Sequence, residues 1–262
     1  MTARTRLDEA TQGRIRTITL RNGRMNVLDR ALQEELLSAC REAEADEAVR
    51  AVLVRGAGEH FAAGADVDEM LTLSPAEAAA LAPRISACLG ALSCLSKPTA
   101  ALLDGFALGG GLEIALAADR RIATRRTRVG LPEILLGVVP GGGGTQRLAE
   151  LVGRSVAKDL VWTGRIVDAE EALALGIVDE LVDDAAALTA RGPDWADQLA
   201  AGPFRAVLAA KAAIDGGLGQ VDDAGLALET AVFGALFETE DQRVGMRSFR
   251  EHGPGRATFT GR

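Results

Sequence analysis

The chain has 262 residues, of which 48% are hydrophobic and 25% charged, a balance typical of a globular protein with a well-buried core. Its net charge of −8 disfavours a nucleic-acid partner, because an acidic surface repels phosphates. Arg4 and Arg6 are not followed by an apolar segment, and no uncharged apolar run is long enough to cross a bilayer. We therefore expect a cytoplasmic protein without a secretion signal or membrane partner.

The first third of the chain alternates strand and helix signals. R-I-R-T-I-T-L, at residues 14–20, alternates polar and apolar side chains as a half-buried strand does. Asp29 is placed to cap a helix over residues 30–44. The following pattern predicts a strand at 49–55, a glycine-containing turn and helix at 62–70, a helix from Ser74-Pro75 to about 95 with Glu77 completing its capping box, and a buried strand at 99–103.

Two glycine-rich turns, each directly before a helix, occupy the middle of the chain. The first covers residues 104–111 and precedes a helix at 112–118; the second covers 140–144 and precedes a helix at 145–152. Between them we expect a short strand at 121–124 and a helical stretch that begins at Leu131-Pro132-Glu133.

The last part of the chain is mostly helical in pattern. Helices are predicted at residues 155–163, 168–175, 183–199, 203–215 and 221–237, with a short strand at 178–182 and an irregular tail at 247–262. The pattern indicates one α/β unit followed by a helical part that docks or forms oligomers. We place the core with the active site at residues 1–200 and the helical oligomerisation region at 201–262.

Few residues are available for metal or nucleophilic chemistry. Cys40, Cys88 and Cys94 form no metal-binding pair, and buried, reduced thiols are expected. The two histidines, His60 and His252, disfavour a histidine-rich metal site and a Ser-His-Asp triad. We expect no metal.

Glu113 stands out in the helix behind the first glycine-rich turn. Its neighbours Leu112, Ile114 and Leu116 imply burial, and a buried carboxylate is costly unless it is paired or functional. A salt bridge to Arg120 or Arg121 is the alternative. The free amides at the start of this helix suit an oxyanion or a phosphate. The spacing matches neither the dinucleotide fingerprint nor a P-loop.

Glu133 is a second carboxylate in apolar company, beside the second glycine-rich turn. If the two environments push the two pKa values apart, one glutamate is charged and the other protonated. Addition of water to a polarised double bond requires this pair, a base for the water and an acid for carbon.

Four segments resemble the crotonase, or enoyl-CoA hydratase/isomerase, superfamily and occur in its order. They are F-A-A-G-A-D, G-F-A-L-G-G-G-L-E, L-P-E-I-L-L-G-V-V-P-G-G-G-G-T-Q-R-L and T-G-R-I-V-D-A-E-E-A-L-A-L-G-I-V-D, within a resemblance that spans residues 12 to 250. The resemblance implies an α/β superhelix of ββα units with C-terminal helices that build homotrimers, usually paired into homohexamers.

The resemblance also implies roles for individual residues. The Ala65 and Gly110 amides would form the oxyanion hole, Glu113 would activate water, and Glu133 would transfer the proton at the α-carbon. The Gly141 amide would help to hold the water. Ala63, Asp66 and Val67 would lie at the coenzyme A site, the backbone of the first and last near the adenine, with a structural role for the Asp66 side chain.

These residues predict an enoyl-CoA hydratase of fatty-acid or related acyl-CoA breakdown. Coenzyme A enters as part of the acyl-CoA substrate, and no separate cofactor is expected. A 3,2-enoyl-CoA isomerase or another crotonase-fold acyl-CoA enzyme is the alternative. The isomerase is disfavoured because many isomerases keep only one of the two glutamates. A non-catalytic crotonase-fold binding protein is a further alternative, disfavoured by the intact oxyanion turn.

Overall fold

The computed structural model describes residues 4–217, 233, 235, 239–252 and 256–262. Its centre is a six-stranded sheet with the strand order β1-β2-β3-β4-β6-β9. β1 and β2 are antiparallel and the other neighbours are parallel. The strands are β1 (Leu7–Gln12), β2 (Ile15–Leu20), β3 (Ala51–Gly56), β4 (Thr99–Leu103), β6 (Arg120–Thr124) and β9 (Glu180–Val182).

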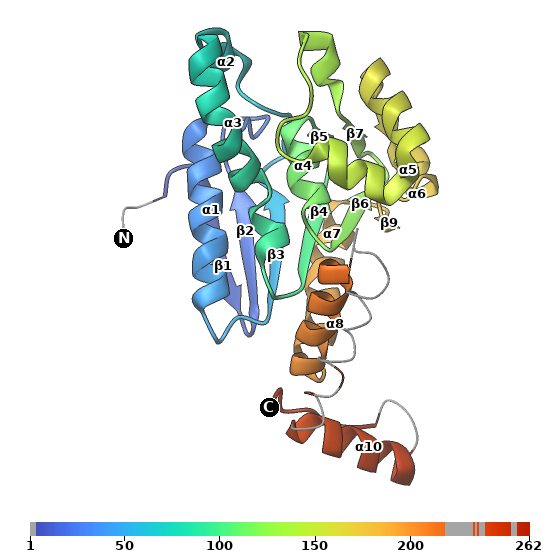
Figure 1. Ribbon diagram of the computed structural model, residues 1–262. Helices are drawn as coiled ribbons and strands as arrows, with labels where there is room; N and C mark the ends of the chain where they lie inside the picture. The colour runs from blue at the N-terminus through green and yellow to red at the C-terminus, as the bar shows by residue number, and fades with distance from the viewer. Residues whose placement is uncertain (1–3, 218–232, 234, 236–238, 253–255) are drawn as a thin grey trace.

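Helices cover both faces of this sheet (Figure 1). Strand side chains alternate between the faces, so Val52, Val54 and Leu103 join the larger core under α1 (Arg30–Ala45) and α3 (Pro75–Leu89). Leu53 and Leu102 face the smaller core, under α7 (Ala185–Ala200). All five residues of β4 are buried because this central strand has a helical layer on each side.

A second, three-stranded sheet includes part of the first glycine-rich segment. It consists of β5 (Phe106–Leu108), β7 (Arg128–Gly130) and β8 (Val167–Asp168). A single bridge between Ala62 and Ala107 ties the 62–65 segment to β5. The remaining elements are α2 (Val67–Leu71), η1 (Ala91–Cys94), α4 (Gly110–Leu116), η2 (Pro132–Leu136), α5 (Gly144–Thr163), α6 (Ala169–Ala174), α8 (Phe204–Gly217) and α10 (Glu240–His252).

The predicted α/β class is confirmed, together with the expected cap at Asp29 and the capping box of Ser74 and Glu77. Several predictions were wrong in detail. Cys94, which was expected to be buried, is exposed. The helix from Ser74 ends at Leu89, because the chain turns at Gly90 into the separate 3-10 helix η1. β5 forms within the segment predicted as a turn. The tail was predicted to be irregular from residue 247, but α10 continues to His252.

The C-terminal part stands away from the sheet in Figure 1, with α8 and α10 below the body that carries the strands. The 256–262 segment returns toward the body, where the Thr260 carbonyl accepts a hydrogen bond from Arg50. The helix predicted at 221–237 falls mainly outside the described residues, and the division at residue 200 stays a prediction.

Within the described ranges, no helix is both long and apolar enough to span a membrane. No cluster of three or more His, Cys, Asp or Glu side chains with metal-binding geometry occurs among the same residues.

Asn26 fixes the loop that leads to the 62–65 segment. It is fully buried, at φ 47°, and its amide nitrogen lies 3.0 Å from the Ala57 carbonyl oxygen, 2.8 Å from that of His60 and 3.2 Å from that of Phe61. Its side-chain oxygen accepts from the Asn22 amide at 3.0 Å. Four backbone groups therefore depend on one side chain.

We expect Asn26→Ala to lower the free energy of unfolding by about 2–4 kcal/mol, because it leaves buried carbonyls unpaired and places alanine at positive φ. Urea unfolding measures the change. Asn22→Ala removes one bond to the Val27 carbonyl and should cost less. Equal stability of Asn26→Ala and the wild type would contradict the account.

Candidate active site

One cavity of about 200 Å³ collects all the residues predicted to act in the reaction or to bind the substrate. They come from the 62–67 segment, the start of α4, η2 and the second glycine-rich turn. The predicted residues that line the cavity are Ala63, Ala65, Asp66, Val67, Gly110, Glu113, Glu133 and Gly141. Their assembly agrees with a shared site, while their individual roles stay predictions.

The 62–65 segment is held open to the cavity by its backbone hydrogen bonds. The Ala63 amide donates to the Met25 carbonyl at 3.0 Å, and the Leu28 amide donates to the Gly64 carbonyl at 2.9 Å. Gly64, at φ +103°, turns the chain so that the next residue, Ala65, is exposed. Asp66 then caps α2 by accepting from the Glu69 amide at 3.1 Å, which gives its side chain a structural contact.

The start of α4 faces this segment at close range. A Cβ on Gly111 would lie 2.2 Å from the Ala62 carbonyl oxygen, so the approach requires glycine. Gly110 is the first residue of α4, and amides in a first turn have no partner within their own helix. The two amides predicted for the oxyanion hole, those of Ala65 and Gly110, therefore belong to backbone segments that line one cavity.

Glu113 is almost completely buried, with 2% of its surface exposed. Its Oε1 atom accepts two backbone hydrogen bonds, from the Gly142 amide at 2.7 Å and from the Gly144 amide at 2.8 Å. Burial raises the pKa of Glu113, and the two amides and the charge of Arg147 oppose that rise. The hydrogen bonds favour a carboxylate and leave its Oε2 atom for another partner.

Glu133 lies in a different environment on η2. Its Oε2 atom is buried and has no hydrogen-bond partner in the part of the chain that the structure describes. Burial, with a smaller contribution from the charge of Glu113, raises the pKa of Glu133 to about 7. Oε1 lies beside Gly109, where a Cβ would be 3.2 Å away. A protonated carboxyl is therefore available close to neutral pH.

The two carboxyl groups thus differ in what holds them, although they share one cavity. Glu113 has two N–H donors from another segment that stabilise negative charge, whereas the donor that lowers the pKa of Glu133 is its own backbone N–H. Such a pair can remove a proton from one atom and deliver a proton to another. The salt bridge considered from sequence does not form, since Arg120 pairs with Glu180 and Arg121 with Asp179.

The rest of the cavity is largely aliphatic. α3 contributes Leu81, Ile85 and Leu89 at a spacing of four residues, so they lie on one side of the helix. Further apolar side chains come from the 66–73 segment and from the end of η2 onward: Val67, Met70, Leu73, Leu136, Val138 and Val139. Apart from the two glutamates, the charged residues that line the cavity are Asp66 and Glu69.

Sequence reasoning missed the two amides that hold Glu113. It selected Gly141 from the second glycine-rich turn, and Gly141 does line the cavity, but the donors to Glu113 are Gly142 and Gly144. The run of four glycines was the available signal. It could not show which amides point at Glu113, because the turn and α4 are adjacent only in the folded chain.

Comparison with known proteins places these features among acyl-CoA enzymes. A family model described as enoyl-CoA hydratase/isomerase matches residues 10–261. A short-chain-enoyl-CoA hydratase of Clostridium acetobutylicum is 38% identical over 242 residues, 92% of each chain. The human mitochondrial methylglutaconyl-CoA hydratase is 37% identical over 88% of this chain and 69% of its own. The crystal structure of an enoyl-CoA hydratase from Bacillus anthracis superposes with a TM-score of 0.92 at 32% identity, over 98% of this chain and 100% of that one.

The half-buried Glu133 makes the stability of the folded chain depend on pH. A carboxyl whose pKa rises from 4.5 to about 7 on folding favours the folded state while it is protonated, and this contribution is lost as the pH rises from about 4.5 through 7. Glu133→Gln cannot ionise. We expect this variant to gain about 1–2 kcal/mol relative to wild type between pH 5 and pH 8, after allowance for solvent screening.

Thermal unfolding of both proteins at pH 5 and pH 8 measures this difference, at roughly 2–4 °C in Tm per kcal/mol. The exposed Glu47→Gln is the control and should show no such change between the two pH values. A Tm difference between Glu133→Gln and wild type that is the same at both pH values would contradict a raised Glu133 pKa.

Proposed function

Because this chain belongs to the enoyl-CoA hydratase/isomerase family, we propose that it is an enoyl-CoA hydratase that adds water across the 2,3 double bond of an acyl-CoA thioester. The crotonase-type α/β fold predicted from the motifs is confirmed. The observation that carries the proposal is the pair of glutamates in one cavity, one held by two amides and one whose buried Oε2 atom has no hydrogen-bond partner among the described residues.

The proposed reaction begins at the thioester carbonyl. The Ala65 and Gly110 N–H groups donate hydrogen bonds to the carbonyl oxygen and stabilise the negative charge that develops there. Withdrawal of electrons toward this oxygen makes C3 electrophilic. Because both donors belong to the backbone, side-chain substitution does not remove them.

The two glutamates then act as the base that deprotonates water and the acid that protonates C2. Oε2 of Glu113 takes a proton from the water while the water oxygen bonds to C3, and the electron pair of the double bond moves to C2 and the thioester. Glu133, protonated at the start, gives its proton to C2. Transfer of the proton from Glu113 to Glu133 restores the starting state, and the same steps in reverse dehydrate the product.

An isomerase of the same fold is the second candidate. It would move one proton between two carbons and would not need a base for water. The two amides on Glu113 support hydration, because they stabilise a second, charged carboxylate next to the protonated one.

The aliphatic lining supports an uncharged acyl group as the substrate. The walls formed by α3 and the 136–139 segment offer an acyl chain apolar contact, and the charged residues in the lining are all acidic. A methylglutaconyl group, named in the human relative, carries a free carboxylate besides the thioester, which these side chains would repel. We place the enzyme in fatty-acid breakdown by β-oxidation, whose acyl groups are uncharged.

The assembly and location that we propose are a homotrimer or homohexamer in the cytoplasm. Apolar side chains are exposed around η2 and the end of α5, among them Leu135, Val139 and Trp162, and such clusters mark interfaces. Gly164 lies against Ile134 and Leu135, which brings the two elements together.

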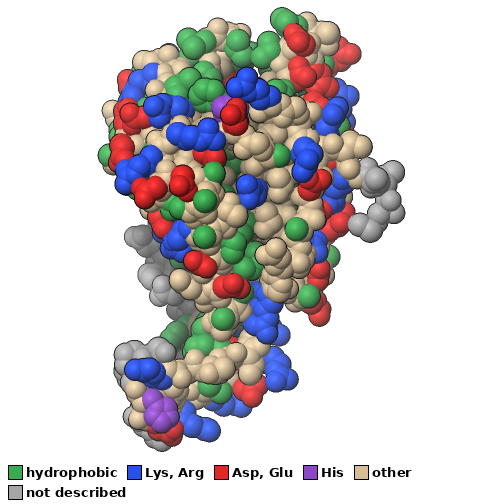
Figure 2. All heavy atoms as spheres, turned by 180° about the vertical axis from the view of Figure 1, so that it is seen from behind, with side chains coloured by type: hydrophobic (Ala, Val, Ile, Leu, Met, Phe, Trp, Pro, Cys, Tyr) green, Lys and Arg blue, Asp and Glu red, His purple; other side chains and the backbone are tan. Residues whose placement is uncertain are grey.

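Cys40, Cys88 and Cys94 are all free, as in a reducing compartment. Basic and acidic side chains are interspersed on the face in Figure 2, unlike a nucleic-acid-binding surface.

We expect Glu113→Gln and Glu133→Gln each to lower kcat/KM for crotonyl-CoA by about 10²–10⁴-fold, because each removes a general acid–base group and keeps the side-chain shape. Loss of the conjugated enoyl-thioester absorbance measures the rate, and Glu47→Gln serves as the control. Near-normal hydration by either variant would remove that glutamate from the mechanism. Isomerisation of 3-enoyl-CoA without hydration of crotonyl-CoA by the wild type would favour the second candidate.

We expect kcat/KM for an uncharged 2-enoyl-CoA to exceed that for 3-methylglutaconyl-CoA by roughly 10²-fold or more, because the latter buries a carboxylate among carboxylates. Ile85→Arg places a cation where α3 lines the cavity and should reduce the ratio of the two kcat/KM values. Ile85→Met adds no charge and should leave that ratio unchanged. Comparable values for the two substrates in the wild type would contradict an uncharged acyl group.

A further inference from the structure

Arg147 lies directly behind the turn that holds Glu113. It is the fourth residue of α5 and is half-buried. Its Nη1 donates to the Gly142 carbonyl at 2.8 Å, and its Nη2 donates to Ser93 Oγ at 3.2 Å. Ser93 in turn donates to the Gly90 carbonyl at 2.8 Å. One guanidinium thus joins the second glycine-rich turn to the junction of α3 and η1.

Two glycines leave the space that this guanidinium occupies. A Cβ on Gly90 would lie 2.8 Å from Nη2, and a Cβ on Gly143 would lie 2.2 Å from Nη1. Gly143 also has φ +103°, which favours glycine. A side chain at either position would displace the guanidinium. Glycine at both positions therefore leaves room for Arg147 to reach Gly142 and Ser93.

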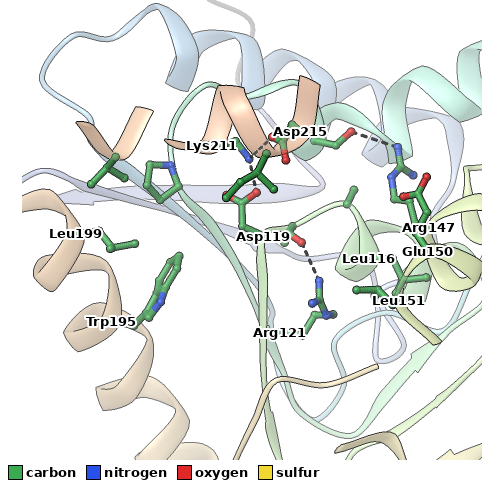
Figure 3. Close-up of a pocket in the computed structure, with 16 residues that line it drawn as sticks. Leu116, Asp119, Arg121, Arg147, Glu150, Leu151, Trp195, Leu199, Lys211 and Asp215 are labelled. Carbon is green, nitrogen blue, oxygen red and sulfur yellow. Dashed lines mark hydrogen bonds and ion pairs between the residues drawn. The ribbon is translucent and has the colours of Figure 1, made fainter. Parts of the chain in front are cut away.

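Arg147 does not line the cavity of the two glutamates. It lines a second, larger cavity of about 630 Å³, between α4, α5, α7 and α8. Figure 3 shows its guanidinium on the wall of that cavity, beside Glu150. Gly142 connects Arg147 to Glu113, since its carbonyl accepts a hydrogen bond from Arg147 and its amide donates one to Glu113.

The charge of Arg147 also reaches Glu113. Arg147 takes part in none of the ion pairs between residues that the structure describes, so no such partner neutralises its charge. That charge opposes the rise in the pKa of Glu113 caused by burial. The other charged group facing Glu113 is Glu133 from η2, whereas α3 presents Leu89, close to the Cα of Gly142 and Gly110.

We propose that Arg147 is a positioning residue of the hydration reaction, which acts by holding the second glycine-rich turn so that the Gly142 and Gly144 amides orient Glu113 toward the water. The inference rests on the proposed hydratase function. Arg147 does not line the cavity in which substrate and water would react. It fixes the carbonyl side of Gly142, and Glu113 keeps both hydrogen bonds on Oε1 while Oε2 takes the proton.

Three variants separate the geometric and electrostatic contributions. Arg147→Met removes both, and we expect kcat for crotonyl-CoA to fall about 10²-fold, the effect of a small misplacement of a catalytic group, with KM little changed. The acidic limb of the kcat/KM profile should move to higher pH, because loss of a cation makes Glu113 easier to protonate.

Arg147→Lys keeps the charge but lacks the planar fork, so kcat should fall about 10-fold with the acidic limb near its wild-type position. Ser93→Ala loses one acceptor, and kcat should fall about fivefold.

Arg154→Met is the matched control, since Arg154 is an exposed arginine on the part of α5 that follows the kink at Gly153. It should retain the wild-type kcat and pH profile. Arg147 variants that behave like Arg154→Met overturn the inference, and so does a loss of kcat in Arg147→Met without movement of the acidic limb, which indicates a purely structural role. If Arg147→Met does not fold, unchanged kcat in both Arg147→Lys and Ser93→Ala overturns it. Absence of hydration by the wild type instead contradicts the proposed function.

Discussion

The two hydrogen bonds from the Gly142 and Gly144 amides to one oxygen of Glu113 are the interaction on which the site depends. An almost fully buried carboxylate is unfavourable unless donors replace its lost water, and here the backbone supplies them. The donors approach because both residues are glycines: a Cβ on either would lie 2.9 Å from a Glu113 oxygen. The hydrogen bonds to the Glu113 carboxylate therefore fix the start of α5 relative to the first turn of α4.

The same constraint separates the two glutamates chemically. Burial raises the pKa of both carboxyls. The Gly142 and Gly144 amides and the charge of Arg147 oppose the rise at Glu113, whereas the opposing donor at Glu133 is its own backbone N–H, and the pKa of Glu133 reaches about 7. A negative Glu113 in the same cavity raises the pKa of Glu133 further. Opposite roles in proton transfer thus arise from two residues of the same type.

The parallel sheet brings the segments of the site together. β3 and β4 lie side by side, and the chain that follows them supplies the 62–65 segment and the start of α4, which meet so closely that only glycine fits at 111. α3, which covers one face of the sheet, provides the aliphatic wall. Its C-terminal end also meets Arg147, so the cavity wall and the glycine-rich turn share one anchor.

The sequence by itself determined the local features: the alternating strands, the caps at Asp29 and Ser74, the glycine-rich turns before helices, and two glutamates in apolar surroundings. Side-chain period and capping chemistry act over a few residues and can be read directly. Only the tertiary structure decided that Gly142 and Gly144 hold Glu113, that Arg147 lies between Gly90 and Gly143, and that β5 forms within a glycine-rich segment. These features depend on contacts between segments far apart in the chain, which a local sequence pattern does not contain.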